Sequence, residues 1–291
     1  MNLREFKKLK RPSLSDSSII TYASILRSLY AKVFQSKDVD VKKFDDTKSI
    51  LEFLKDVPAN KRKTILSALV IATDNADYRD QMLGDIKTYN KGISTQEKTP
   101  EQEASWITMD EVKKIYDSLA KQANVLYKKE TLSTVDLQEI QNFVIVSLLG
   151  GVFIPPRRSL DYTNFKIREI DPALNYLDKK TLVFNSYKTA KTYGQQTVEC
   201  PPPLLKILKK FISVNKTDFL LFDTNGGKLT PVKLTQRLNK IFKGKTSVNS
   251  LRHSYLTGKY ADTIKVNEEL EKDMTAMGSS KSQSTGYIKK E

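Results

Sequence analysis

The sequence has very little cysteine, histidine or tryptophan, with one of each among its 291 residues. The single Cys200 excludes an intramolecular disulfide framework, and one Cys with one His does not supply the ligands of a usual zinc site. No apolar run approaches the roughly 18 residues of a membrane span, and the N-terminal segment lacks the apolar core of a secretory signal. These absences predict an intracellular protein with no membrane partner, whose chemistry is metal-free or uses a carboxylate-bound metal.

The chain has an excess of positive charge, with a net charge of +15 at 39% hydrophobic and 29% charged residues. The net charge is +4 up to Ala104 and +11 after it. A basic surface of this size attracts polyphosphates at long range and gains affinity from counterion release. The composition is that of a globular chain, its length suits two domains, and its charge favours nucleic acid as the partner.

Apolar residues at helical spacing predict a small all-helical bundle over residues 1–90, beginning with a helix capped near Ser15. The stretch 91–105 is polar, lacks an apolar period and contains Gly and Pro, which is typical of a linker. A capped helix at Thr108 then opens a second domain, residues 106–291.

The second domain is expected to be mainly helical with a small sheet. Residues 181–184 (T-L-V-F) and 196–198 flank a polar, basic tip, which predicts a β-hairpin with an exposed turn. The apolar residues 219–222 predict a short strand or buried segment. Apolar spacing predicts helices over 137–149, 231–242, 248–260 and 266–277.

Two basic clusters lie in the first domain. Residues 1–12 form an arm that contacts phosphates, acts as a nuclear address or is simply solvated. Lys61, Arg62 and Lys63 crowd the start of a helix, where they either grip a DNA backbone or form a solvated face.

Four places carry candidate chemistry, and the first is P-P-R-R-S-L-D-Y at 155–162. Two prolines stiffen the approach to the arginines, and Asp161 follows Arg158 by three residues and is placed to orient it. The alternative is an ordinary capped helix with an Arg–Asp pair.

The second place is the hairpin tip, which carries Lys188 and Lys191. An ammonium in an exposed turn can enter a groove and lie beside a leaving oxygen, but turn lysines often serve only solubility.

The third and fourth places lie near the C-terminus. In N-S-L-R-H-S, Arg252 and His253 lie on a predicted helix, and His253 is expected to be a hydrogen-bonded core residue. Tyr287 follows Gly286 and a serine-rich segment, which suits a nucleophile that must move, although such a tyrosine also packs its ring.

The order Arg, Lys, Arg, Tyr in a basic two-domain chain resembles the tyrosine recombinase family, whose catalytic domain breaks and rejoins DNA. The resemblance covers the whole chain in layout and is good at residue level from about Trp106 onward. It implies a helical core-binding (DNA-clamping) domain, a linker and an α+β catalytic domain. The P-P-R-R-S-L-D-Y form looks like that of recombinases in large eukaryotic DNA viruses, virophages and related mobile elements.

The resemblance assigns roles to particular residues. The first catalytic arginine matches Arg158, with Arg157 as the fallback, and the hairpin lysine matches Lys188, with Lys191 as second choice. The second arginine is Arg252, and the nucleophile is Tyr287.

Two catalytic positions depart from the family pattern. Asn249 stands where His or Lys is usual, and Ser279 stands where His or Trp is usual. Neither residue handles a proton at neutral pH as His does. The departures leave reduced activity open.

The implied activity is site-specific integration or recombination through a 3′-phosphotyrosyl intermediate, without metal, ATP or other cofactor. The expected partner is double-stranded DNA, with a homotetramer on two duplexes and possible monomers off DNA. A viral member acts in the host nucleus or viral factory, and others in the cytoplasm or nucleoid. The alternatives are relaxation of DNA by a type IB topoisomerase, or a DNA-binding protein of the same fold with weak or lost catalysis.

Overall fold

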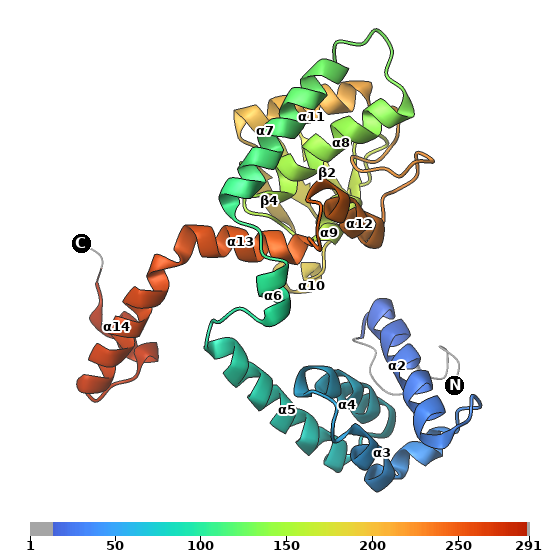
Figure 1. Cartoon of the computed structure of the whole chain (residues 1–291), viewed down its shortest axis with the longest axis vertical. Helices are drawn as coiled ribbons and strands as arrows, with labels where there is room; N and C mark the ends of the chain where they lie inside the picture. Colours follow the sequence, from blue (N-terminus) through green and yellow to red (C-terminus); the bar gives the residue numbers. More distant parts are fainter. Residues whose placement is uncertain (1–13, 290–291) are drawn as a thin grey trace. The chain divides into compact units, whose positions relative to one another are not determined.

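The computed structural model describes residues 14–289, and the chain divides into two compact units, one up to Lys98 and one from Thr99 (Figure 1). The basic arm predicted over 1–12 lies outside the described residues. Between 14 and 289 no helix is long and apolar enough to cross a bilayer.

The first unit is a helical bundle, as the apolar periodicity predicts. Ser15 caps its first helix by accepting a hydrogen bond from the Ser18 amide at 3.2 Å. Leu26, Phe44 and Leu66 are fully buried in its core. Its elements are α2 (Asp16–Phe34), the 3-10 helix η1 (Val41–Asp45), α3 (Thr47–Leu54), α4 (Ala59–Thr73) and α5 (Ala76–Ser94).

The stretch predicted as a linker is partly helical. Helix α5 continues to Ser94, and a short helix α6 spans Pro100–Ala104. Thr99 and Gln102 form a reciprocal capping box at its start, with Pro100 in the first turn. Pro100 at this position starts a helix and does not break one, and the boundary between the two units, from Lys98 to Thr99, lies within the stretch predicted as a linker.

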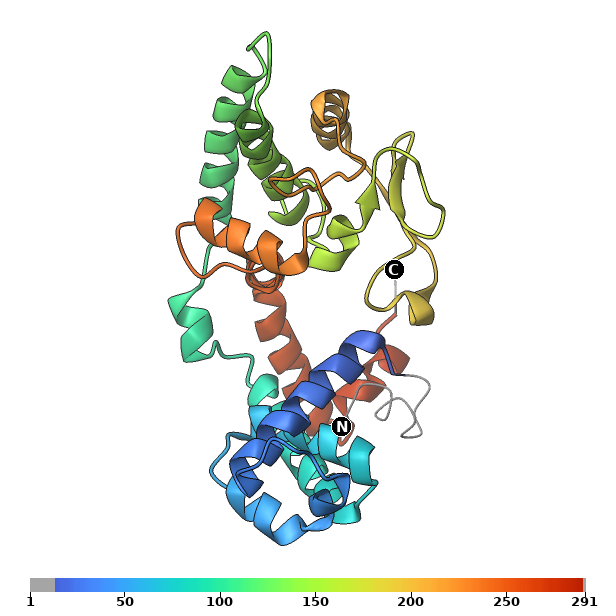
Figure 2. The ribbon, with the colours of Figure 1, turned by 90° about the vertical axis from the view of Figure 1, so that its right-hand side faces the viewer.

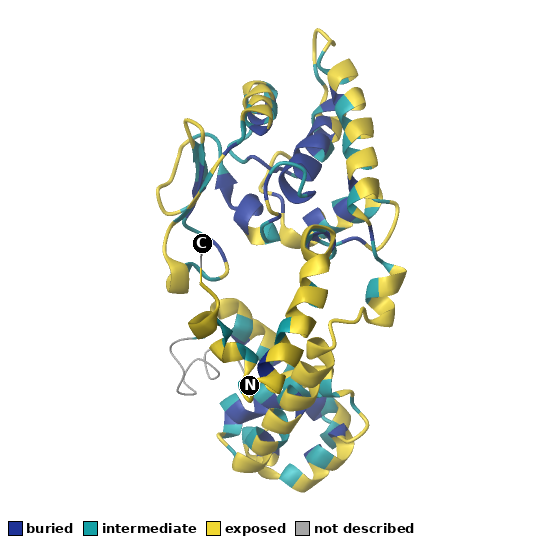
Figure 3. Cartoon of the chain, turned by 90° about the vertical axis from the view of Figure 1, so that its left-hand side faces the viewer, coloured by how far each residue is buried: buried dark blue, intermediate teal, exposed yellow. Residues whose placement is uncertain are grey.

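The second unit is built around α8, which is largely buried, most completely over its apolar C-terminal half (Figure 3). Capping boxes at Thr108 and Ser133 start α7 and α8, and the two helices pack together. Its helices are α7 (Met109–Leu126), α8 (Thr134–Leu149), α9 (Ser159–Thr163), α10 (Ala190–Tyr193), α11 (Pro202–Val214), α12 (Pro231–Ile241), α13 (Val248–Tyr260), α14 (Asp262–Ala276), η2 (Lys281–Gln283) and α15 (Ser284–Tyr287).

One four-stranded sheet completes the second unit, in the order β1 (Phe165–Lys166), β2 (Asn175–Asp178), β3 (Thr181–Phe184) and β4 (Gln196–Glu199). The first pair is parallel and the other two are antiparallel. The predicted hairpin is confirmed, since β3 and β4 pair from Thr181 opposite Glu199 to Phe184 opposite Gln196. Their connection leaves the sheet as a loop that carries α10 (Figure 2).

The other predicted elements agree with the structure in kind and differ at some ends. Helix α13 has the predicted bounds, whereas α14 begins at Asp262, earlier than expected. Residues 220–222 are buried, and Phe222 forms an isolated bridge with Lys228. The chain is therefore mainly α-helical with a small β-sheet, as expected.

Cys200 is buried directly after β4. Burial raises the pKa of its thiol to about 11, so the chain's one cysteine is a structural residue and not a nucleophile.

Candidate functional site

The two adjacent arginines before α9 have different surroundings. Arg157 Nε donates to Asp161 Oδ2 at 2.8 Å, and its guanidinium lies 4.0 Å from the centre of the Phe184 ring. Arg158 is half-buried, and its side chain forms no hydrogen bond or ion pair within residues 14–289. Arg157 is thus held by the fold, while Arg158 keeps its guanidinium donors available.

The expected orientation of Arg158 by Asp161 is wrong. Arg158 occupies the N-cap position of α9, and its carbonyl oxygen accepts from the Asp161 amide at 3.1 Å. The Asp161 carboxylate pairs instead with Arg157, four positions before it. Both side chains of the Arg157–Asp161 pair are largely buried, at 17% and 3% exposed. Burial raises the pKa of Asp161, and the charge of Arg157 opposes that shift.

The β3–β4 connection is fixed at its base and exposed at Lys188. Tyr187 is buried, and its hydroxyl donates to the Gly194 carbonyl at 2.7 Å. The next residue, Lys188, is exposed, and Lys191 is exposed on α10. Neither lysine side chain has a hydrogen-bond or ion-pair partner in the part of the chain that the structure describes.

The first arginine segment and the lysine turn meet in the structure. The Arg157 guanidinium lies 5.3 Å from the Tyr187 ring, and Asn164 Nδ2 donates to Ser186 Oγ at 3.0 Å. Arg158 directly follows Arg157 in the chain, and Lys188 directly follows Tyr187. The fold therefore links the segments that carry the first predicted arginine and the predicted lysine.

The second arginine segment is helix α13, which begins with a capping box between Ser247 and Ser250. Leu251 is fully buried, and Arg252 beside it is half-buried without a hydrogen-bond or ion-pair partner among the described residues. Asn249 lies one turn before Arg252 and is exposed. The predicted pair therefore lies on neighbouring positions of one helix face.

Gly151 joins the two arginine segments. It follows α8 with φ +74°, and a Cβ built there would lie 2.5 Å from Cδ2 of Tyr255 on α13. Only a residue without a side chain allows this approach. Tyr255 of α13 thus packs on the start of the loop that leads to Arg158.

His253 is not the core residue that the sequence predicts. It is exposed, and it lines a cavity of about 220 Å³ with Asn249, Ser250 and Trp106. The apolar stripe of α13 runs through Val248 and Leu251 instead, since His253 follows Leu251 by two positions and points to another side of the helix.

Tyr287 ends the short helix α15 and is 60% exposed. Its segment packs with η2, which in turn packs with α14. Ser279 is half-buried before η2, and its amide donates to the Met274 carbonyl at 2.8 Å. Within residues 14–289, no hydrogen bond or ion pair joins any two of the six predicted catalytic residues, which are Arg158, Lys188, Asn249, Arg252, Ser279 and Tyr287.

Of the three basic residues predicted to contact DNA from the first unit, Lys61, Arg62 and Lys63, the arginine is held by the fold. Arg62 donates to both Asp85 oxygens, at 2.9 and 2.8 Å, and to the Lys55 carbonyl at 2.7 Å. The Arg62 hydrogen bonds lower the pKa of the Asp85 carboxyl. Lys63 lies over the Tyr89 ring, whereas Lys61 is exposed. Of the three, Lys61 is the cation least engaged by the fold.

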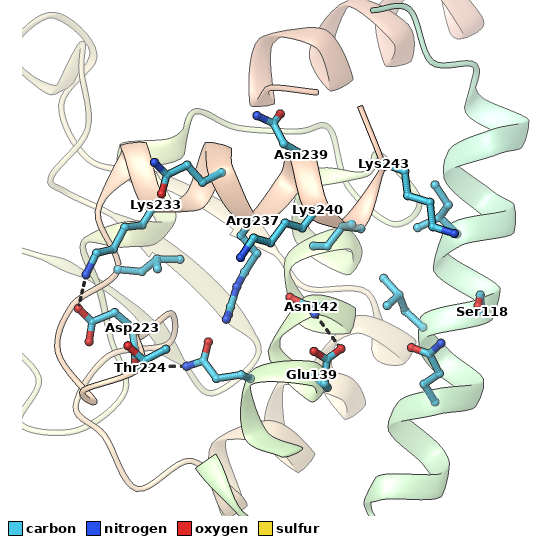
Figure 4. Close-up of a pocket in the computed structure, with 17 residues that line it drawn as sticks. Ser118, Glu139, Asn142, Asp223, Thr224, Lys233, Arg237, Asn239, Lys240 and Lys243 are labelled. Carbon is cyan, nitrogen blue, oxygen red and sulfur yellow. Dashed lines mark hydrogen bonds and ion pairs between the residues drawn. The ribbon is translucent and has the colours of Figure 1, made fainter. Parts of the chain in front are cut away.

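A cavity of about 970 Å³ lies between α7, α8 and α12 and contains none of the predicted site residues (Figure 4). Arg237 extends into it from α12 (Figure 4). Arg237 is a candidate functional residue that was not predicted from the sequence, where α12 was expected only as a helix. Its signal was the spacing of Lys233, Arg237 and Lys240, which places three cations on one helix face. Across the described part of the chain, no group of three or more His, Cys, Asp or Glu is placed to hold a metal.

Comparisons with known proteins give likenesses in structure, two of which are described here, and none in sequence. No family model and no curated protein matches the chain. A lambda integrase dimer bound to a COC′ core site aligns over 88% of this chain and 87% of that chain, at 16% identity and a TM-score of 0.49. XerH site-specific recombinase, bound to its difH substrate before cleavage, aligns over 89% of this chain and 84% of that chain, at 14% identity and a TM-score of 0.41. At such low identities and TM-scores, neither likeness assigns a role to any residue of this chain.

Proposed function

We propose that this protein is a site-specific DNA recombinase of the tyrosine recombinase type, which cleaves and rejoins DNA with Tyr287 as nucleophile. The observation that carries the proposal is the burial and the hydrogen bonding of the Arg158 and Arg252 side chains. Both guanidinium groups are half-buried, yet neither has a hydrogen-bond or ion-pair partner within the described residues. A partly desolvated arginine without an acceptor favours an anion, and a phosphodiester supplies one.

The reaction follows from the chemistry of the four side chains. The Tyr287 oxygen forms a bond to the scissile phosphorus, and the bond from phosphorus to the 5′-oxygen breaks. Lys188 gives a proton to the departing 5′-oxygen, while the tyrosine proton leaves to solvent. Arg158 and Arg252 donate to the non-bridging oxygens, where negative charge gathers in the transition state. Attack by the free 5′-hydroxyl on the phosphotyrosyl bond reverses these steps and rejoins a strand.

The exposure of Tyr287 and Lys188 supports this assignment. A nucleophile and a proton donor must both reach a substrate the size of a duplex, and both side chains are exposed. Asn249 and Ser279 supply hydrogen bonds to the phosphate at positions where other recombinases use proton-handling groups. We propose double-stranded DNA as the partner, with four copies of the chain on two duplexes.

Trapping on nicked DNA tests the proposal. The protein is incubated with a pool of nicked suicide duplexes, and a denaturing gel is read for a covalent protein–DNA band. Wild type is expected to form the band and Tyr287→Phe to form none. Tyr260→Phe is the matched control, because Tyr260 is also exposed but ends α13. Wild-type protein that binds DNA and forms no band excludes the enzymatic function and leaves DNA binding alone.

A second candidate is relaxation of DNA by a monomer with the same chemistry. It is favoured because all four side chains belong to one chain, with Lys188 and Tyr287 exposed and Arg158 and Arg252 half-buried, so no second copy of the chain is required. Relaxation of a supercoiled plasmid without sequence preference supports it, whereas exchange between two duplexes that share one sequence supports the recombinase.

A further inference from the structure

The cavity between α7, α8 and α12 contains three buried polar atoms without hydrogen-bond partners among the described residues. They are Gln138 Oε1, Asn142 Oδ1 and Arg237 Nη1. Burying a polar atom without a partner is unfavourable, and such atoms are few in folded proteins. Three in one cavity of about 970 Å³ indicate a site that is completed by a ligand.

The first acceptor is fixed in orientation by the fold. Gln138 is 7% exposed, and its Nε2 donates to the carbonyl oxygens of Phe222 at 3.3 Å and Asp223 at 3.2 Å. Turning the amide over would place Oε1 against these two carbonyl oxygens, so Oε1 must stay on the other side. Gln138 therefore offers the cavity an acceptor and no donor.

The second acceptor lies one helical turn further along α8. Asn142 Nδ2 donates to Glu139 Oε2 at 3.1 Å, which leaves Oδ1 as the unpaired atom (Figure 4). Residues four apart on a helix share a face. Two acceptors without donors thus lie side by side beneath the floor of the cavity, where a ligand that turns either side chain toward it supplies an N–H or O–H donor.

The opposite wall from α12 is cationic. Burial lowers the pKa of Arg237, and Glu139 opposes this shift. Lys233 is held by Asp223 at 2.8 Å, but Lys240 also lines the cavity and has no ion pair within the described residues. Lys243 adds a further cation to the lining. The lining has two carboxylates, and since Asp223 is paired with Lys233, Glu139 is left to balance the other cations. The wall therefore favours an anionic group.

We infer that this cavity binds a free mononucleotide. Its phosphate lies against Arg237 and Lys240, and the amino group of its base donates to the acceptors of Gln138 and Asn142. The apolar side chains of Leu119 and Leu229 line the space available to the flat ring. Small-molecule sites commonly have volumes of about 300–1,000 Å³. Inorganic phosphate leaves both acceptors unfilled, and an apolar ligand leaves the arginine unpaired.

Calorimetric titration of the full chain without DNA tests the inference, using AMP, GMP, UMP, adenosine and inorganic phosphate. AMP or GMP is expected to bind most tightly. Adenosine and phosphate are each expected to bind at least about tenfold more weakly, because each lacks one half of the contacts. UMP is expected to be weaker than AMP, since uracil has no amino group. The inference is overturned if no nucleotide binds at millimolar concentration, or if phosphate alone binds as well as AMP.

Variants assign the binding to this cavity. Arg237→Gln and Asn142→Leu are each expected to weaken AMP by about tenfold. Lys206→Gln removes an exposed lysine of α11 outside the cavity and is expected to change nothing. Circular dichroism verifies folding, and Lys240→Gln reports on the phosphate if Arg237→Gln does not fold. Unchanged AMP affinity in Arg237→Gln or Lys240→Gln contradicts the site.

A duplex DNA arm separates the two sources of phosphate. If Arg237→Gln weakens duplex binding while no mononucleotide binds, the cavity belongs to the DNA-binding surface and the inference is wrong. The inference does not depend on DNA cleavage, because its measurements use no DNA substrate and leave Tyr287 intact. Failure of either proposal is therefore visible without the other.

Discussion

Arg157 and Asp161 form a largely buried ion pair, with 2.8 Å between Nε and Oδ2. The side chain of the neighbouring Arg158 forms no such bond to any residue between 14 and 289. Two adjacent arginines in one short motif thus differ in function, one holding α9 against Phe184 and the other available to an anion.

Replacing these arginines in turn separates the two roles. Arg157→Ala is expected to lower the free energy of unfolding by about 3–5 kcal/mol, because it leaves Asp161 buried without its partner. Arg158→Ala is expected to change it by no more than about 0.5 kcal/mol and to abolish the covalent DNA band. Urea unfolding and the trapping gel measure the two quantities. Equal destabilisation by both variants contradicts the division of roles.

Acid stability is expected to depend on Asp136, which completes the capping box of α8 by accepting from the Ser133 amide. Hydrogen bonds from Lys129 and from Ser133 lower the pKa of this carboxyl to about 2. A group with a lowered folded-state pKa stabilises the fold above its unfolded pKa of about 4 and loses that contribution as the pH falls to about 2. Asp136→Asn is therefore expected to flatten the decline of stability between about pH 4 and pH 2.

Thermal unfolding at several pH values measures this slope. Asp178→Asn is the matched control, since no hydrogen bond or ion pair of its side chain occurs within residues 14–289. A slope in Asp136→Asn as steep as that of wild type contradicts the assignment.

Helix ends were predictable from sequence where their signals are local. Ser15 and Ser247 cap helices that begin one residue later, and Pro231 stands in the first turn of α12. Each signal operates within a few residues, so no knowledge of the fold is needed. The β3–β4 hairpin was predictable for the same reason.

Side-chain partners were not predictable, because they depend on other elements. Spacing alone suggested that Asp161 orients Arg158, but the ring of Phe184, on β3, provides a surface for Arg157 instead. The prediction of a buried His253 was wrong because Leu251, two positions earlier, faces the core and the histidine does not. Gln138 and Arg237 meet only after α8 and α12 have packed, so nothing in the sequence pairs them.

The close approach of Tyr255 to Gly151 predicts that a side chain at position 151 would destabilise the packing between the two arginine segments. Gly151→Ala is expected to destabilise the fold by about 2–4 kcal/mol, from a positive φ and from the clash with the Tyr255 ring. Gly278→Ala is the control, because Gly278 also has a positive φ, of +72°, but has no atom within 4 Å of a built Cβ. It is expected to lose only about 1–2 kcal/mol.

Thermal unfolding measures both glycine variants. Tyr255→Ala removes the ring, so Gly151→Ala is expected to cost less in that background. A Gly151→Ala effect that equals that of Gly278→Ala, or that does not change when Tyr255 is removed, argues against a steric cause.

Replacing Ser279 tests whether the proposed site lacks a proton-handling side chain at this position. Ser279→His is expected to leave DNA cleavage unchanged or to increase it by up to about 100-fold, the low end of what a general acid contributes. Ser279→Ala is the control and is expected to reduce cleavage by removing a hydrogen-bond donor. Single-turnover cleavage of a suicide duplex measures the rates, and a large loss in Ser279→His shows that Ser279 has been misplaced in the site and does not occupy a proton-handling position.

Arg237 is expected to lower the stability of the unliganded protein. Its Nη1 is buried without a partner in the described part of the chain, so Arg237→Leu is expected to raise the free energy of unfolding by about 1 kcal/mol. Arg168 is the matched control in the same unit, because its guanidinium donates to the carbonyl oxygens of Thr217 and Ile212. Arg168→Leu is expected to destabilise by about 1–3 kcal/mol, since those bonds are lost. Urea unfolding without nucleotide measures both, and a destabilised Arg237→Leu indicates that the guanidinium is already satisfied by water in the cavity.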